Sequence, residues 1–121
     1  MAFKQLTPVL WTEKLNESIA FYTEILGFTC RERNDDWQWA SLLKDGTGLM
    51  LAHPNVHTNY KEIAFSGSFY FEVDNVETLW QQLQNVTEIV YKLGTFPWEM
   101  KEFAIRDNNG YILQFGERIY K

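Results

Sequence analysis

Signals for strands and helices follow one another in the same order in both halves of the chain, and this internal repeat most constrains the fold. In each half a strand comes first, then a helix, then three further strands. When one half is laid on the other, Thr7–Trp11 matches Ser68–Glu72, and Leu15 matches Val76 near the start of each helix. Few residues are identical, so what repeats is a supersecondary unit. The repeat predicts an α+β protein built from two tandem βαβββ modules.

The first module opens with a predicted strand at Phe3–Trp11, in which Pro8 suits a sheet edge. The helix is predicted in LNESIAFYTEILGF, whose apolar residues recur on one face. Asn16 or Ser18 is the candidate N-terminal cap, and Gly27 stands where a left-handed C-terminal cap is expected. Three more strands are predicted at 28–33, 37–44 and 49–53, separated by turns at 34–36 and in KDGTG.

The second module begins with a predicted strand at 68–73 and a helix that starts in an Asp74-x-x-Glu77 capping box. A strand at 88–93 and a hairpin within 97–117 complete it. We expect one domain of residues 1–121, with module one at about 1–60 and module two at about 65–121. Each helix covers one face of its sheet, so the two open faces can curl around a shared cup.

Composition excludes several classes of protein. The net charge is −5, and the sequence has no cluster of Lys and Arg of the kind that phosphates require, so we expect no nucleic-acid partner. No apolar run is long enough for a membrane span, and the N-terminus lacks the apolar core of a signal peptide. A single cysteine, Cys30, rules out an internal disulfide and fits a reducing compartment, so we expect a cytoplasmic protein.

Alternation along the strands indicates which side chains point away from the helices. If the leucines and phenylalanines of each strand pack under a helix, a set of Trp, Tyr, Met and small polar residues faces the cup. Such a lining suits a flat, partly aromatic ligand, although the same aromatics can instead fill the cavity or bury a dimer interface. The candidate ligand-binding residues are Trp11, Trp37, Trp39, Ser41, Met50, Ser68, Tyr70, Trp98, Glu102 and Gln114.

No catalytic group is evident. His53 and His57 flank Pro54, which disfavours a helix that would bring them together, so we interpret them as loop histidines. Cys30 has no base beside it and is interpreted as a small buried apolar residue. Glu102 is a candidate base if it faces the cup, but an acidic residue on a strand is more often a solvated edge residue. Whether Glu102 or Phe103 faces the cup depends on a turn, DNNG, that sequence alone does not type.

Three segments resemble the vicinal oxygen chelate superfamily. LNESIAFYTEILGF resembles the family's first helix, FYFEVDNVETLW its second strand and helix entry, and RDNNGYILQFGE its closing hairpin. Lys14 and Asn108 stand where the family usually has Asp and Pro. The resemblance implies the glyoxalase/bleomycin resistance fold, which hosts both enzymes and binding proteins.

Enzymes of that superfamily hold a metal with His, Glu or Gln at four positions on the cup face. By motif these positions fall on Thr7, Met50, Ser68 and Gln114 of this chain. Hard cations prefer carboxylate oxygen, and zinc or nickel prefer imidazole or thiolate. A donor set of two hydroxyls, one thioether and one amide therefore predicts no metal and no cofactor.

The stretch PWEMKEFAIRDNNG is similar to the metal-free, bleomycin-resistance-type branch of the superfamily. In that branch two chains pair, often by exchanging the N-terminal strand, and a drug is bound without reaction. The resemblance implies a homodimer that sequesters an aromatic or cationic small molecule. The alternatives are a glyoxalase-like lyase or isomerase with a displaced or absent metal site, and a metal-dependent thiol transferase of the same fold.

Overall fold

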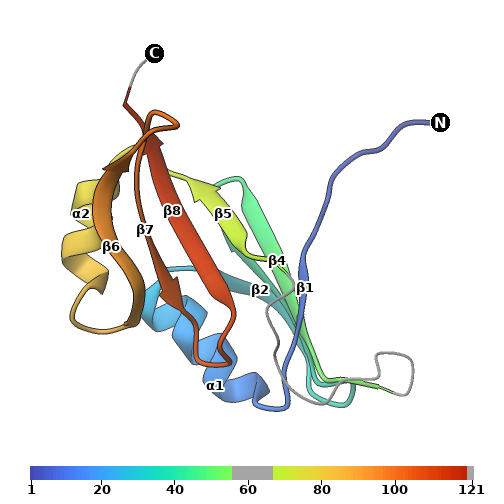
Figure 1. The fold of residues 1–121 in the computed structure, drawn as a ribbon. Helices are drawn as coiled ribbons and strands as arrows, with labels where there is room; N and C mark the ends of the chain where they lie inside the picture. Colours follow the sequence, from blue (N-terminus) through green and yellow to red (C-terminus); the bar gives the residue numbers. More distant parts are fainter. Residues whose placement is uncertain (56–66, 120–121) are drawn as a thin grey trace. The chain divides into compact units, whose positions relative to one another are not determined.

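The computed structural model describes residues 1–55 and 67–119, and the chain divides into two compact units, Met1–Glu62 and Ile63–Lys121. Each unit contains one four-stranded sheet and one helical segment (Figure 1). The two tandem modules confirm the predicted α+β class and βαβββ order. The sharing of one cup by the two sheets stays a prediction.

The sheet of the first unit has the strand order β1-β4-β3-β2, in which β1 is parallel to β4 and the other pairs are antiparallel. One face carries the buried residues Leu10, Ala40, Leu42, Leu49 and Leu51, and the helix α1 lies against β3 and β4. The elements are β1 (Val9–Trp11), α1 (Leu15–Ala20), a π-helical turn (Phe21–Ile25), β2 (Thr29–Asn34), β3 (Trp39–Lys44) and β4 (Thr47–Ala52).

The N-terminal cap predicted for α1 is wrong. Neither Asn16 nor Ser18 occupies the cap position, which is taken by Lys14 without a side-chain hydrogen bond. Ser18 is buried in the first turn, where its hydroxyl donates to the Lys14 carbonyl over 2.8 Å and lies 3.1 Å from the Thr12 hydroxyl oxygen. The backbone N–H of Lys14 donates to that same Thr12 oxygen over 2.9 Å. At the other end the prediction is confirmed, because Gly27 has a left-handed φ of 81°.

Several predicted strand bounds are also wrong. The strand β4 begins at Thr47 rather than Leu49, and β6 ends at Phe96 rather than Leu93. The first strand begins at Val9 rather than Phe3. The strand predicted from Trp37 begins at Trp39, because Gln38 adopts a positive φ of 53° inside the turn that precedes β3. Trp37 therefore belongs to the turn, where its backbone N–H donates to Asn34 Oδ1 over 3.0 Å, and its side chain is 74% exposed.

The second unit repeats this topology. Its sheet has the order β5-β8-β7-β6, with β5 parallel to β8, and the helix α2 lies against β7 and β8. The cap of α2 is Asn75, one residue after the predicted Asp74, and Asn75 Oδ1 accepts from the N–H of Thr78 over 3.3 Å. The elements are β5 (Phe69–Glu72), α2 (Val76–Leu83), β6 (Glu88–Phe96), β7 (Met100–Arg106) and β8 (Ile112–Arg118).

The core of the second unit lies between α2 and the sheet. The buried ring of Phe103 packs edge-on against Trp80 of α2, with ring centroids 5.2 Å apart, and against Phe115 at 5.3 Å. Phe103 therefore faces the helix, and by alternation its neighbour Glu102 faces the opposite side of the sheet. This settles the orientation that the sequence left open.

The turn between β7 and β8 sets the register that places Glu102. The Asp107 carboxylate oxygen Oδ1 accepts the backbone N–H groups of Asn109, Gly110 and Tyr111, each over 2.9 Å. Gly110 has a φ of 102°, a backbone conformation that residues with a side chain rarely adopt. In the resulting register Glu102 pairs with Gly116 of β8.

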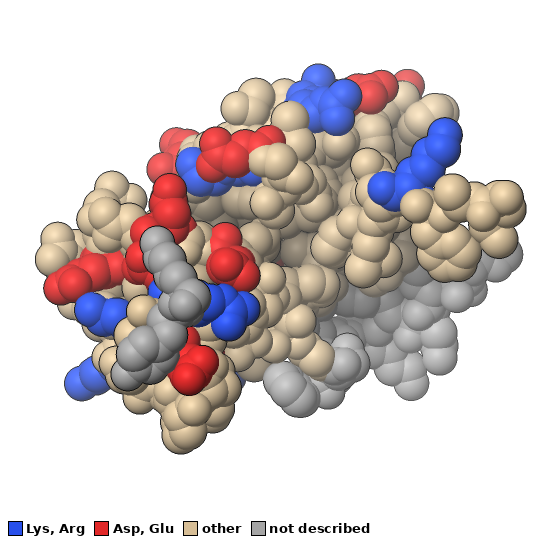
Figure 2. Space-filling model, turned by 90° about the horizontal axis from the view of Figure 1, so that it is seen from above, with Lys and Arg blue, Asp and Glu red and all other residues tan. Residues whose placement is uncertain are grey.

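Charges are interspersed on the face seen in Figure 2, where Lys and Arg lie among Asp and Glu and the described residues form no continuous basic patch. This distribution agrees with the net charge of −5. No helix in the described part of the chain is long and apolar enough to cross a membrane.

Candidate functional site

A buried carboxylate lies at the centre of the open face of the second unit. Glu102 is on β7, an interior strand, and only 2% of the residue is exposed. Its Oε1 accepts from the Tyr70 hydroxyl and from the Trp98 indole N–H, each over 2.8 Å. Its Oε2 accepts from the Tyr91 hydroxyl. The interpretation of Glu102 as a solvated edge residue is therefore wrong, since three aromatic side chains enclose its charge.

Glycines on both neighbouring strands make room for this arrangement. Glu102 is paired with Gly94 of β6 on one side and with Gly116 of β8 on the other. A Cβ at Gly116 would lie 2.0 Å from the Tyr70 hydroxyl oxygen and 3.1 Å from the terminal carbon of Met100. At Gly94 the nearest atom to such a Cβ is 3.8 Å away. Gly116 is thus required for Tyr70 to reach Glu102, whereas a Cβ at Gly94 would make only ordinary van der Waals contacts.

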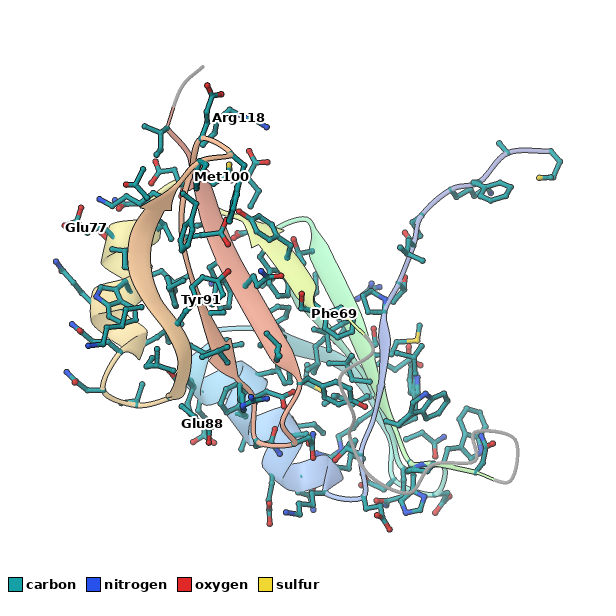
Figure 3. All side chains as sticks on the ribbon, in the orientation of Figure 1. Phe69, Glu77, Glu88, Tyr91, Met100 and Arg118 are labelled. Carbon is teal, nitrogen blue, oxygen red and sulfur yellow. The ribbon has the colours of Figure 1, made fainter. Side chains whose placement is uncertain are left out.

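Two polar residues extend the network across the sheet. Ser68 donates to Gln114 Oε1, so the amide group of Gln114 is oriented to donate to the Tyr91 hydroxyl oxygen, over 2.9 Å. Tyr91 then uses its own proton to reach Glu102. In Figure 3 the labelled Phe69 and Tyr91 mark the two edge strands that this network joins. Each donor in this series of hydrogen bonds points toward Glu102, whose carboxylate is the final acceptor.

The ionisation of the cluster follows from these contacts. Burial raises the pKa of Glu102, but the hydrogen bonds from Trp98, Tyr91 and Tyr70 outweigh it and hold that pKa below its usual range. Burial and the hydrogen bond to Glu102 raise the pKa of Tyr91 to about 12. The same two causes raise the pKa of Tyr70 above the ordinary range of a phenol. At neutral pH the cluster is therefore one carboxylate anion with two neutral phenols.

The aromatic rings are held but remain accessible. Trp98 stacks on Phe96 with centroids 4.9 Å apart and an interplanar angle of 15°, and Phe96 also packs edge-on against Tyr91. Trp98 is 58% exposed and Tyr70 is 45% exposed. We call these four residues, Tyr70, Tyr91, Phe96 and Trp98, the aromatic wall. Because Glu102 anchors three of them, the wall presents π-faces in a fixed arrangement.

The candidate residues of the first unit, except Trp37, lie together on one face of its sheet. Trp11 and Trp39 pair with Ala52 from opposite sides, and Ser41 pairs with Met50 in the next row. These five are half-buried and alternate with the buried leucines, so they share the face turned away from α1. Trp37 lies apart from them in the turn before β3.

The donors at the family's metal positions do not fit a divalent cation. Ser68 and Gln114 are hydrogen-bonded to each other, and Thr7 accepts from the Gln5 amide over 3.1 Å. Among the described residues no three His, Cys, Asp or Glu side chains are grouped to hold a metal ion. His53 is exposed after β4 with its Nδ1 2.8 Å from the Pro54 carbonyl oxygen, and His57 lies outside the described residues. Cys30 is half-buried on the edge strand β2.

Sequence reasoning predicted Ser68, Tyr70, Trp98, Glu102 and Gln114 as site residues, and it missed Tyr91, Phe96, Gly94 and Gly116. Tyr91 was overlooked because nothing in the sequence pairs it with Glu102, and Phe96 was overlooked because the predicted strand ended at 93. The glycines at 94 and 116 were overlooked because their role depends on strand pairing. One signal was present, since a glycine inside a strand often marks a close approach of another group.

A family model described as the Glyoxalase/Bleomycin resistance protein/Dioxygenase superfamily matches residues 4–115. No curated protein matches the chain.

Three solved structures illustrate the similarity of fold. A protein of unknown function from Agrobacterium tumefaciens is 20% identical with a TM-score of 0.81, covering 97% of this chain and 95% of that one. A glyoxalase/bleomycin resistance protein/dioxygenase from Nocardioides is 20% identical with a TM-score of 0.78, covering 98% and 86%. TioX from Micromonospora sp. ML1 is 16% identical with a TM-score of 0.76, covering 96% and 99%. At these identities the likeness concerns the fold alone.

Proposed function

The chain belongs to the glyoxalase/bleomycin resistance protein/dioxygenase superfamily, and within that superfamily we propose that it is a small-molecule binding protein that holds a flat aromatic ligand against the aromatic wall without changing it chemically. The proposal takes the site to be metal-free and the protein to be a homodimer that sequesters a drug-like compound. Superfamily membership does not by itself separate binding from catalysis, because one fold hosts many functions.

The observation that carries the proposal is the state of Glu102. An efficient acid or base has a pKa near the working pH, but here the pKa of the carboxyl is lowered and the pKa values of Tyr70 and Tyr91 are raised. Both carboxylate oxygens already accept hydrogen bonds from the protein. The cluster is thus poorly suited to proton transfer and well suited to hold aromatic rings in place for a ligand.

The donor chemistry supports a site without metal. The Ser68 hydroxyl donates to the carboxamide oxygen of Gln114. Both groups are neutral and are bonded to each other, so they are poor ligands for a divalent cation. A stoichiometric divalent ion in elemental analysis of the purified protein would overturn this part of the proposal. The enzyme alternatives that need a metal would then regain support.

Binding is tested by tryptophan fluorescence with 9-methylacridine, a neutral tricyclic dye. We expect saturable quenching, and we expect Trp98→Ala to weaken dye binding at least about fivefold, since stacking on one aromatic side chain contributes about 1–3 kcal/mol. Trp37→Ala is the matched comparison, because Trp37 is the more exposed tryptophan and lies in the other unit. Absence of quenching in the unmodified protein, or equal losses in the two variants, would contradict the proposal.

A further inference from the structure

We propose that the aromatic wall selects a planar, delocalised cation over a neutral molecule of the same shape, and that Glu102 is the source of this preference. The inference rests on the proposed function, since it names the class of ligand for the same site. It depends on three properties of the cluster: the bonds by which the carboxylate polarises the rings, the lack of an ion pair with any basic side chain among the described residues, and its inaccessibility to direct contact.

The first property is the bonding of the rings to a charged acceptor. Trp98 Nε1 and the Tyr70 hydroxyl both donate to Oε1, each over 2.8 Å. A carboxylate that accepts an N–H or O–H draws the hydrogen toward itself and shifts electron density back into the ring. The face of an aromatic ring is already its negative region. These hydrogen bonds therefore strengthen the attraction of the wall for a cation placed on it.

The second property is that no basic side chain among the described residues forms an ion pair with Glu102. The ion pairs identified in the described chain are Arg33–Asp35, Lys101–Glu77 and Arg106–Glu88, and Glu102 takes part in none of them. All three groups bonded to Glu102 are neutral donors. Its negative charge thus persists beneath the rings, in surroundings that screen it less than water does.

The third property is that a ligand does not reach the carboxylate. Glu102 is 2% exposed, and both of its oxygens are occupied by the aromatic donors. A compact ammonium group would have to displace one of these donors to form an ion pair. A planar cation with spread charge needs only to stack on the exposed faces of Tyr70 and Trp98, so it is the better match to this site.

The experiment compares two dyes of equal size, N-methylacridinium and 9-methylacridine, by fluorescence titration in mildly alkaline buffer, where the ring nitrogen of 9-methylacridine stays unprotonated and that dye neutral. We expect the cation to bind the unmodified protein about tenfold more tightly than the neutral dye. In Glu102→Gln, which keeps an acceptor oxygen but removes the charge, we expect the ratio to fall close to one. Glu72→Gln is the matched control, because Glu72 is an exposed acid on the same face that pairs with Gly116, and we expect it to keep the ratio.

A second measurement needs no variant and so does not depend on folding of Glu102→Gln. In about 1 M salt, where the Debye length is about 3 Å, attraction by exposed acids is largely screened and attraction by a buried charge is not. We expect most of the preference for the cation to survive in the unmodified protein. A preference that disappears in salt would overturn the inference.

The remaining outcomes separate this inference from the proposed function. Equal affinity of the two dyes for the unmodified protein overturns the preference alone. A preference for the cation that is lost in Glu72→Gln but kept in Glu102→Gln also overturns the inference. In that case the cation binds instead at a depression of about 360 Å³ that is lined by Glu72, Val73, Asp74, Glu117 and Arg118. Failure of both dyes to bind overturns the inference and the proposed function together.

Discussion

At the scale of the residue, the open face of the second unit depends on a carboxylate that bears charge inside a sheet. Burying an ionised group is costly unless hydrogen bonds replace its hydration, and Glu102 receives three such bonds from Tyr70, Tyr91 and Trp98. All three donors are aromatic, so the residues that stabilise the charge are also those that form the wall. Stability and the proposed binding role therefore share the same contacts.

Gly116→Ala tests whether the wall depends on space at β8. The added methyl would collide with Tyr70, whose hydroxyl oxygen lies 2.0 Å from the Cβ position, so we expect a loss of about 1–3 kcal/mol in the free energy of unfolding by urea. Gly94→Ala is the matched control on the other side of Glu102, where the nearest atom is 3.8 Å away. It should leave stability equal or raise it slightly, because alanine restricts the unfolded chain. Equal losses in both variants would contradict this account of Gly116.

Glu102 also predicts a dependence of stability on pH. Its pKa is lower in the folded protein than in the unfolded chain, so its contribution is complete above the ordinary glutamate value of about 4.3 and is lost as the pH falls below it. We expect the unmodified protein to be more stable than Glu102→Gln near neutral pH, and the difference to narrow as the medium is acidified. Urea unfolding of both proteins at a series of pH values measures this difference. A constant difference at every pH would argue against an ionised Glu102.

At the scale of the element, local patterns predicted most of the fold, and the errors occur at the ends of elements, where one side-chain contact or one backbone angle sets the boundary. Alternation correctly placed Ala40 and Leu42 in the buried layer of the first unit, because burial on one face of a strand is a local property. The α1 cap was misassigned because Ser18 bonds to Thr12 and Lys14 in the preceding segment. Nothing in the sequence signals the positive φ of Gln38 that moves Trp37 into a turn.

The candidate site was likewise predicted only in part from the sequence. Strand parity placed Tyr70 and Gln114 on the open face, but the burial of Glu102 follows from the interior position of β7, which only long-range pairing establishes. An isolated strand does not reveal which neighbours it acquires or where those neighbours carry glycine. For that reason, local sequence patterns did not predict that Tyr70, Tyr91 and Trp98 enclose Glu102.

The turn between β7 and β8 gives a prediction at this scale. Three backbone N–H groups donate to Asp107 Oδ1, and the residue is buried. Asp107→Ala leaves those donors without their acceptor, so we expect a loss of about 2 kcal/mol in the free energy of unfolding. Asp107→Asn keeps a neutral acceptor and should lose about half as much. Equal effects of the two substitutions would show that the oxygen acceptor is not what stabilises the turn.

At the scale of the whole molecule, the N-terminal arm, residues 1–8, lies outside the sheet of its own chain. The sequence predicted a strand over Phe3–Trp11, but only Val9–Trp11 pairs in the sheet. Phe3 and Leu6 are 94% and 92% exposed on the preceding segment. Apolar side chains on a segment outside the sheet are suited to cover a second copy of the chain, and we propose that this arm does so in a homodimer.

We therefore expect sedimentation velocity to show a dimer at micromolar concentration. Replacing both Phe3 and Leu6 by Ser should shift the equilibrium toward monomer at least about tenfold, since burial of one such side chain contributes about 1.5–3 kcal/mol. Trp37→Ser removes an exposed apolar side chain of similar size from a turn and should leave the dimer intact. A monomeric unmodified protein would refute the dimer, whereas a dimer that tolerates the double substitution would refute the role of the arm alone.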